Sequence, residues 1–498
     1  MSSAVHQFDR PFSPMLSRGV LSVAVVGGAA VLGLITVSEP LLAAGAAAVC
    51  LLGLAAISIP KVATFAAIFL LYSNVAVVAV RFHGVPKIVG QGMVLLLVIP
   101  LVHYVVLRRQ KLVIHPLMPL MALYLSAQAL SMMFSRNLEE SLASITEYVL
   151  EGMLIVLLVT NVIRTRRDVR WATWALLLAG LVMTAGPIYQ QITHSFASSL
   201  GGFGQTNDIG FLTGDVTAQG AVRQHRLSGT IGEQNRFAQI TLVLVPLGLL
   251  MARTAQSRWA SLLAMFLAGV AAVGCALTFS RGAAVAFVLT IGVMIVLRLI
   301  TIKQLAIVTV AAVILLAAMP HYLNRLVTIQ QVTNLIGARP STVQATDGAI
   351  AGRATEMLAA AQIFVDHPVV GVGPGMFKQY SRQYGNRLGI RRLEENRESH
   401  SLYLGIAAET GSLGIACFLL MLGVTLVSLV RARKLFRAGS SRELDTMAAA
   451  YFCAVVVLMA TGLSMHMAYI RFFYLILGMA AAVASVAALA RPPAEPAR

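Results

Sequence analysis

Two long apolar runs meet at a three-residue turn in ASLLAMFLAGVAAVGCALTFSRGAAVAFVLTIGVMIVLRLI, residues 260–300. The runs 260–279 and 283–300 are each long enough to cross a hydrocarbon core as a helix, which takes roughly 17 to 25 residues. The turn between them contains Arg281, a permanently charged side chain that must reach lipid headgroups or point inward. This stretch therefore predicts a transmembrane hairpin whose tip carries either a functional or an interfacial arginine.

The same apolar pattern recurs along the chain. Hydrophobic residues make up 58% of the 498 residues and charged residues 12%, whereas soluble domains carry roughly 25% charged residues. Strands of a membrane barrel would alternate apolar and polar residues, and these runs do not. We therefore predict an all-α fold, a polytopic transmembrane helix bundle with about 14 spans. The candidate spans are 20–37, 41–59, 62–80, 88–106, 116–133, 144–163, 172–192, 237–252, 260–279, 283–300, 304–318, 401–430, 448–466 and 471–490.

Basic residues mark every second connection, and the positive-inside rule places such connections in the cytoplasm. Both termini are then expected in the cytoplasm. The opposite connections face outward, to the periplasm or cell exterior, and two of them are long: 193–236, and 319–400 between spans 11 and 12. The basic residues are Lys61, Arg108, Arg109, Lys111, Arg164, Arg166, Arg167, Arg170, Arg253, Arg258, Arg298, Lys303, Arg431, Arg433, Lys434, Arg437 and Arg442.

The spans and long loops divide the chain into four regions. A cytoplasmic tail, 1–19, precedes an N-terminal transmembrane region, 20–236, which ends with the first long loop. A core region, 237–430, includes the second long loop. A C-terminal hairpin and tail, 431–498, completes the chain.

Charge and motif content narrow the chemistry. The formal net charge is +18, but the arginines are scattered between spans, which indicates topology and no nucleic-acid partner. The four cysteines all fall in expected spans, so neither a disulfide nor thiol chemistry is expected. The absence of DxD, HExxH, CxxC and GxSxG motifs argues against metal-dependent sugar-nucleotide transferases, zincins and α/β-hydrolases.

His400 is the main candidate for a general base. It lies in ESHSLYLGIAAETG, and the pattern predicts that it occupies the first turn of a helix capped by Ser399. An imidazole with a pKa near 6.5 can accept and later release a proton. The competing interpretation is a solvated loop histidine. Tyr403 and Glu409 follow on the same helix and are candidates for substrate binding.

Three arginines precede a span in VRQHRLSGTIGEQNRFAQI: Arg223, Arg226 and Arg236. Arginine offers a planar fork of donors that matches phosphate oxygens. Arginines at a span end can also be interfacial anchors. The three are therefore candidate phosphate ligands with a structural alternative.

Further candidates lie near other outward ends. Glu151 is a carboxylate one turn inside a span, where it is costly unless it faces a cavity or a partner. Arg471 flanks the last outward turn together with His466. Gly373 and Gly375, in GVGPGMF, permit close ligand approach or a structural turn. No Lys-Ser or Lys-Thr follows them, so they do not form a P-loop.

Four segments, taken in order, resemble the O-antigen ligase and polymerase superfamily of bacterial membrane glycosyltransferases: RLSGTIGEQNRFA, TFSRGA, HPVVGVGPGMF and ESHSLYLGIAAETGSLG. The resemblance implies a glycan donor linked to undecaprenyl pyrophosphate and no cofactor, metal or nucleotide. It implies functional roles for Arg226, Arg281 and His400. A Pro-Asn pair of the family pattern is replaced by Gln234 and Asn235, which leaves open whether Arg226 or Arg236 contacts the phosphate.

These roles imply one mechanism. His400 would deprotonate an acceptor sugar hydroxyl, and the arginines would hold the departing pyrophosphate. The acceptor could be a second lipid-linked glycan in a polymerase, with a chain-length regulator as a possible partner, or lipid A-core or a protein in a ligase. The span count favours the polymerase by analogy. A polysaccharide flippase would share the hydropathy, but the paired repeats and broken helices typical of such transporters are not visible in the sequence.

Overall fold

The computed structural model describes residues 60–87, 93–206, 215–216, 222–318, 348–389, 396–466 and 470–489. The expected spans 20–37 and 41–59 lie outside the described residues. Seven described helices are long and apolar enough to cross a membrane, or eight if the bent pair α3 (Pro60–Ser73) and α4 (Val75–Phe82) forms one span. The expected helical, multi-pass architecture is confirmed, whereas the count of about 14 spans is not.

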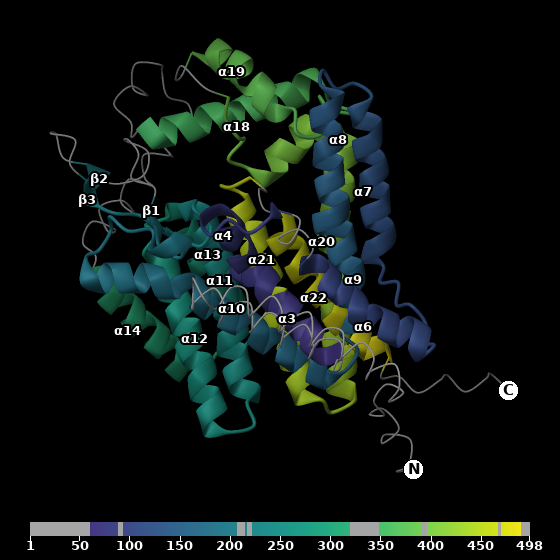
Figure 1. Cartoon of the computed structure of the whole chain (residues 1–498), viewed down its shortest axis with the longest axis vertical. Coiled ribbons are helices and arrows are strands. Elements are labelled where there is room, and N and C mark those ends of the chain that lie inside the picture. Colours follow the sequence, from purple (N-terminus) through teal and green to yellow (C-terminus); the bar gives the residue numbers. More distant parts are fainter. Residues whose placement is uncertain are drawn as a thin grey trace, which may run out of the picture.

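The bundle helices follow the expected apolar runs closely (Figure 1). The first long helix is continuous from Leu138 to Val162, so it begins six residues before the expected span 144–163. Between α4 and this helix lie η1 (Met93–Leu97), α6 (Val98–Val102), η2 (His103–Leu107) and α7 (Leu117–Met132). The helix 138–162 comprises α8 (Leu138–Glu147), η3 (Tyr148–Met153) and α9 (Leu154–Val162). The later helices are α10 (Arg166–Thr193), α11 (Gln234–Thr254), α12 (Arg258–Ala276), α13 (Arg281–Val296), α14 (Ile302–Ala318), α20 (Leu402–Ala438), α21 (Arg442–Gly462) and α22 (Ile470–Leu489).

Close helix approach holds the core together. Helix α11 packs against α12 and α21, while α20 packs against α7, α21 and α22. Gly248 of α11 lies so close to Ala268 of α12 that an added Cβ would come within 2.8 Å of the alanine side chain. Small residues at such contacts let helices approach where lipid offers no hydrophobic driving force.

Ion pairs between basic and acidic side chains join the connections at one end of the bundle. Lys61 lies 3.8 Å from Asp168, which joins the start of α3 to the start of α10. Glu443 at the start of α21 accepts from Arg170 of α10 at 2.5 Å. The charge pattern predicts that the connections before α3, α10 and α21 lie on one side of the membrane. These ion pairs bring the same connections to one end of the fold.

Two breaks interrupt expected helices. The expected span 62–80 is wrong as a single helix, because α3 and α4 meet at an angle of 59°. Asn74 sits at this break with φ of 62° and donates a hydrogen bond to the Thr230 carbonyl at 2.5 Å. Helix α20 is broken at Gly411, where φ is 65° and the Val369 backbone occupies the space of a Cβ. Both breaks are set by partners distant in sequence.

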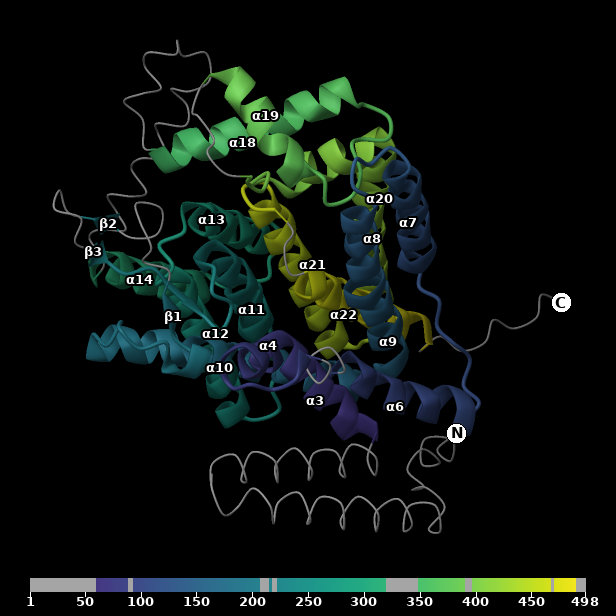
Figure 2. The same ribbon diagram turned by 45° about the horizontal axis from the view of Figure 1, so that its top comes forward.

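The two long connections contain regular structure. Residues 193–236 include η4 (Leu200–Gly202) and four short strands in two antiparallel pairs. Strand β1 (Gln205–Thr206) pairs with β4 (Leu227–Gly229), and β2 (Asp215–Val216) pairs with β3 (Val222–Gln224). Within 319–400, helices α18 (Gly348–Asp366) and α19 (Phe377–Leu388) lie together across one end of the bundle in both views (Figures 1 and 2). The fold is therefore mainly helical, with these small sheets added.

Candidate active site

His400 lies immediately before the cap of α20. The expected cap, Ser399, is wrong: Ser401 accepts from the Leu404 amide, and the helix begins at Leu402. His400 itself has φ of 48°, a left-handed conformation that ends any helix before it. A bulky residue in this region is strained, and such strain is concentrated at functional sites.

The His400 imidazole is held from one side. Its Nδ1 lies 2.6 Å from Oε2 of Glu356, on α18. The same nitrogen is 3.2 Å from the Glu398 carbonyl oxygen. The side chain remains 29% exposed. One ring nitrogen of His400 is thus committed to protein acceptors, and the imidazole is not a freely solvated loop group.

A second histidine connects His400 to an arginine. The rings of His400 and His466 are 5.9 Å apart in an edge-to-face arrangement. His466 Nε2 accepts from Nη2 of Arg236, which lies in the first turn of α11. Glu398 completes the group, 3.6 Å from His466 and 2.6 Å from Lys378 Nζ. Helices α11, α19, α20 and the α21–α22 connection therefore meet here.

Arg226 links two connections between helices. It is 3% exposed. Its Nε donates to the Thr278 carbonyl at 2.8 Å, and its Nη2 donates to Asn235 Oδ1 at 3.1 Å. Thr278 lies three residues before Arg281, and Asn235 directly precedes Arg236. The Arg226 guanidinium therefore fixes the position of both neighbouring arginine-bearing segments.

Arg281 is the first residue of α13, and Ser280 caps the helix. The following Gly282 lies against Ser464, so closely that a Cβ would meet the serine Oγ. Ser464 is two residues before His466. The arginine turn therefore lies against the connection that carries His466.

Arg471 and Glu151 form a neighbouring polar group. Arg471 Nη1 lies 4.0 Å from Glu151, which sits in the π-helical turn η3. Arg471 Nη2 contacts Asn74 at the break between α3 and α4. Thr230, three residues after Leu227 of β4, bonds both Asn74 and the Ser73 carbonyl. This group therefore borders the segment that follows Arg226.

Glu409 and Tyr403 make contacts that stabilise the fold. Glu409 Oε1 accepts from the Phe377 amide at 3.1 Å, and its carbonyl accepts from the Gly373 amide at 2.9 Å. The Tyr403 hydroxyl donates to the Met459 carbonyl at 2.8 Å. Their expected role in substrate binding gains no support from these contacts.

Backbone geometry explains the glycines near α19. Gly373 and Gly375 have φ of 111° and 74°, which side chains at these positions would resist. They shape the connection between α18 and α19. Arg223, the remaining expected ligand, lies on β3.

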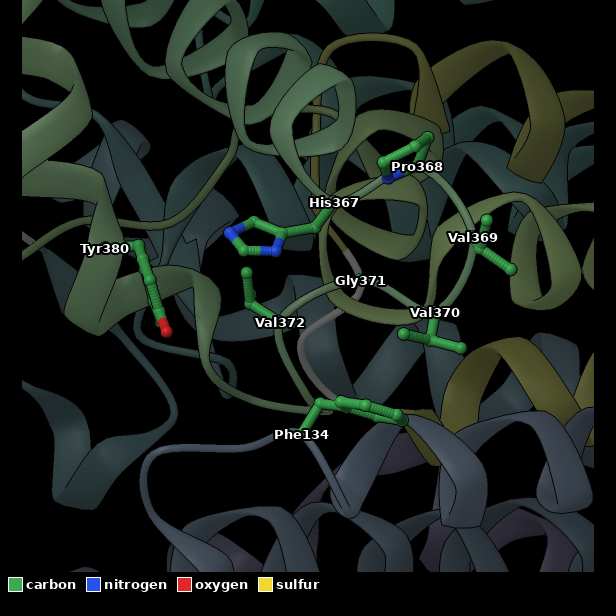
Figure 3. A pocket seen from close by; sticks show the side chains of 8 residues that line it. All are labelled: Phe134, His367, Pro368, Val369, Val370, Gly371, Val372 and Tyr380. Atoms are coloured by element: carbon green, nitrogen blue, oxygen red, sulfur yellow. The ribbon is translucent and has the colours of Figure 1, made fainter.

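The connection between α18 and α19 also borders a cavity of about 290 Å³. His367 projects toward the cavity between Tyr380 and the chain at Gly371, with Phe134 on the opposite side (Figure 3). None of the predicted site residues lines it. His367 lies just beyond the C-terminal end of α18, eleven residues after Glu356. The cavity is therefore distinct from the group around His400.

Electrostatics keep His466 neutral. Burial lowers its pKa well below the usual 6.5, and the positive charges of Arg236 and Lys378, together with His400 whenever that imidazole is protonated, act in the same direction. The acidic group that the described residues place beside it is Glu398, at 3.6 Å. A neutral imidazole can accept through Nε2, as the contact with Arg236 requires.

This burial predicts a pH dependence. Below about pH 6.5 the unfolded chain protonates this histidine, while His466 in the folded protein stays neutral. The unfolded state then binds more protons, so the folded state loses stability as pH falls. His466→Asn keeps an acceptor but does not titrate. Melting temperatures measured from about pH 7.5 to about pH 5 should fall more steeply for the wild type than for this variant. Parallel curves would contradict a buried neutral His466.

Comparison with known proteins adds an independent observation. Residues 266–419 match the family model described as O-antigen ligase. This part of the chain, less than a third of its length, is therefore similar to the O-antigen ligase family, which supports the expected membership of the O-antigen ligase and polymerase superfamily. No curated protein matches the chain. The superfamily match covers Arg281, Glu356 and His400, whereas Arg226, Arg236 and the His466 connection lie outside it.

Sequence reasoning missed Glu356, and it did not place Lys378 and Glu398 in the group. Glu356 lies in RATEMLAAAQIF within the superfamily match, next to the buried Thr355 and before the buried Ala359, Ala360 and Ile363. A lone carboxylate on the apolar face of an amphipathic helix was the available signal. The sequence-based prediction places residues 319–400 in a loop, so no helix face is expected there.

Proposed function

We propose that this protein is a bacterial inner-membrane glycosyltransferase that moves a glycan from undecaprenyl pyrophosphate to an acceptor sugar hydroxyl on the periplasmic side. The observation that carries the proposal is the grouping of His400, His466 and Arg236 beside the Arg226 and Arg281 segments. Part of this group falls within the superfamily match. A base beside several fixed arginines suits transfer from a diphosphate leaving group.

His400 acts as the general base. Its Nδ1 is occupied by Glu356 and the Glu398 carbonyl, so Nε2 is the nitrogen that takes the proton from the acceptor hydroxyl. The hydroxyl oxygen then forms a bond to the anomeric carbon of the donor. The bond from that carbon to the pyrophosphate oxygen breaks, and the oxygen keeps the electron pair. A single displacement inverts the anomeric centre.

The arginines stabilise the leaving pyrophosphate. Charge-assisted hydrogen bonds from guanidinium groups to phosphate oxygens are among the stronger hydrogen bonds in proteins. Arg236 and Arg281 both lie in the first turn of a helix, α11 and α13, where the helix dipole also favours an anion. Arg226 holds the two segments in register and contributes its own charge. Transfer then needs neither a nucleotide nor a metal ion, because the donor is already activated.

The acceptor defines two forms of the proposal. In the polymerase form it is the sugar of a second lipid-linked glycan, and a chain-length regulator would be a natural partner. In the ligase form it is lipid A-core or a protein, and the description of the matching family model favours this second candidate. The polymerase preference rested on a count of about 14 spans, which the described residues do not supply.

Product size separates the two forms. Purified protein in vesicles should be given a lipid-linked glycan, with or without lipid A-core. A ladder of products from the donor alone identifies a polymerase, whereas one transfer that needs lipid A-core identifies a ligase.

A deletion strain tests whether the protein is a transferase or a flippase. For a transferase, lipid-linked glycans should accumulate on the outer leaflet. Accumulation on the inner leaflet would instead indicate a flippase and reject the proposal.

A further inference from the structure

The carboxylate of Glu356 is a buried acidic group beside His400. It lies on α18 with 1% of its side chain exposed. A buried carboxylate is costly unless it is paired, because it loses its hydration. Its ion-pair partners among the described residues are His400, at 2.6 Å, and Arg397, at 3.6 Å. The shorter contact is to the imidazole, so the position of Glu356 calls for an explanation through His400.

We infer that Glu356 is a positioning residue that fixes the tautomer and orientation of His400 during glycan transfer. A neutral imidazole carries one N–H group. When the hydrogen is on Nδ1, beside the Glu356 carboxylate and the Glu398 carbonyl, the lone pair is on Nε2, which is the form that a general base requires. Given the proposed function, on which this assignment rests, Glu356 acts on the acceptor only through His400.

The same contact stabilises the charged state formed during transfer. When Nε2 takes the acceptor proton, His400 becomes an imidazolium 2.6 Å from the Glu356 carboxylate. The attraction between these charges is strong because the carboxylate is shielded from water. Arg397 remains at the other carboxylate oxygen, so Glu356 keeps a cationic partner in both protonation states of the imidazole.

The backbone at His400 supports this assignment independently. Its φ of 48° is held by the cap at Ser401 and by Ser399, which donates to the Ser401 carbonyl at 2.8 Å. Helix α18, which carries Glu356, packs along α20. The strained backbone at His400 therefore occurs where the imidazole contacts Glu356 of α18, as expected for a functional position.

Glu356→Ala should lower kcat by about 100-fold, which is part of the rate that a positioned general base contributes, with donor Kd and KM within about 3-fold of wild type. If the alanine variant folds poorly, Glu356→Asp is measured in its place, and it should keep part of the wild-type rate because it retains a carboxylate. Asp366→Asn, which changes an exposed acid at the end of the same helix, is the control and should keep wild-type kcat. A loss of donor affinity that accounts for the whole effect would overturn the assignment.

The decisive experiment is a double-mutant cycle with His400→Ala. If Glu356 acts through His400, the double variant has the same residual rate as His400→Ala alone. An independent further loss of about 100-fold in the double variant would overturn the positioning role. If His400→Ala transfers glycan at the wild-type rate, the proposed function fails instead, and the two failures are distinguished.

Discussion

His400→Ala is expected to lower the rate of glycan transfer by about 10² to 10⁴-fold, the range that a positioned general base contributes. Donor binding should stay near the wild-type level, because the arginines that hold the pyrophosphate are unchanged. The variant removes the imidazole that contacts Glu356 through Nδ1 and lies beside the His466 ring. The effect should therefore appear in kcat and not in the donor dissociation constant.

A radiolabelled lipid-linked glycan allows binding and transfer to be measured on the same sample. His83→Ala is a suitable control, because His83 is an exposed histidine whose Nε2 lies 2.9 Å from the Gly201 carbonyl. It should transfer glycan at the wild-type rate. Equal loss of binding and transfer in His400→Ala would indicate damage to the fold of the site and not the loss of a base.

Arg281→Ala is expected to lower transfer by about 10² to 10³-fold, the usual loss when one preorganised donor to a developing anion is removed. Arg281→Lys should recover only part of this loss, because lysine keeps the charge but lacks the planar pair of donors. Donor affinity should fall as well, since the pyrophosphate carries its charge before transfer. The loss should be larger in transfer than in binding, because negative charge grows on the leaving oxygen.

Arg258→Ala is the matched control for this series. Arg258 is an exposed arginine at the first residue of α12, and Arg281 follows the other end of this helix. Its replacement should leave both donor binding and transfer close to the wild-type values. If Arg258→Ala and Arg281→Ala reduce transfer equally, Arg281 serves as a membrane anchor and has no specific role with the phosphate.

Much of the helical architecture could be predicted from the sequence, because apolar runs of membrane length have few alternatives to a helix. The expected 237–252 and 260–279 correspond to helices Gln234–Thr254 and Arg258–Ala276. The break at Asn74 could not be predicted in this way. It depends on Thr230 and Arg471, both distant in sequence, and a local hydropathy pattern contains no information about such contacts.

The candidate site was predicted in its residue types but not in its connections. His400 and Arg281 were readable as polar groups at the ends of apolar runs, where burial would be costly without a role. Glu356 was not, because its importance arises from the packing of α18 on α20. The expected cap at Ser399 is wrong for a related reason: His400 adopts a positive φ, and a sequence with a serine on either side of His400 does not reveal which serine caps the helix.

Release of undecaprenyl pyrophosphate is the most direct test of the central claim. Purified protein should be incubated with a lipid-linked glycan and an acceptor, in the presence of a chelator and without nucleotide. The account predicts one undecaprenyl pyrophosphate released for each glycan transferred, with an inverted anomeric centre in the product and little release by His400→Ala. Transfer that requires a nucleotide or a metal ion, or that retains the anomeric configuration, would contradict it.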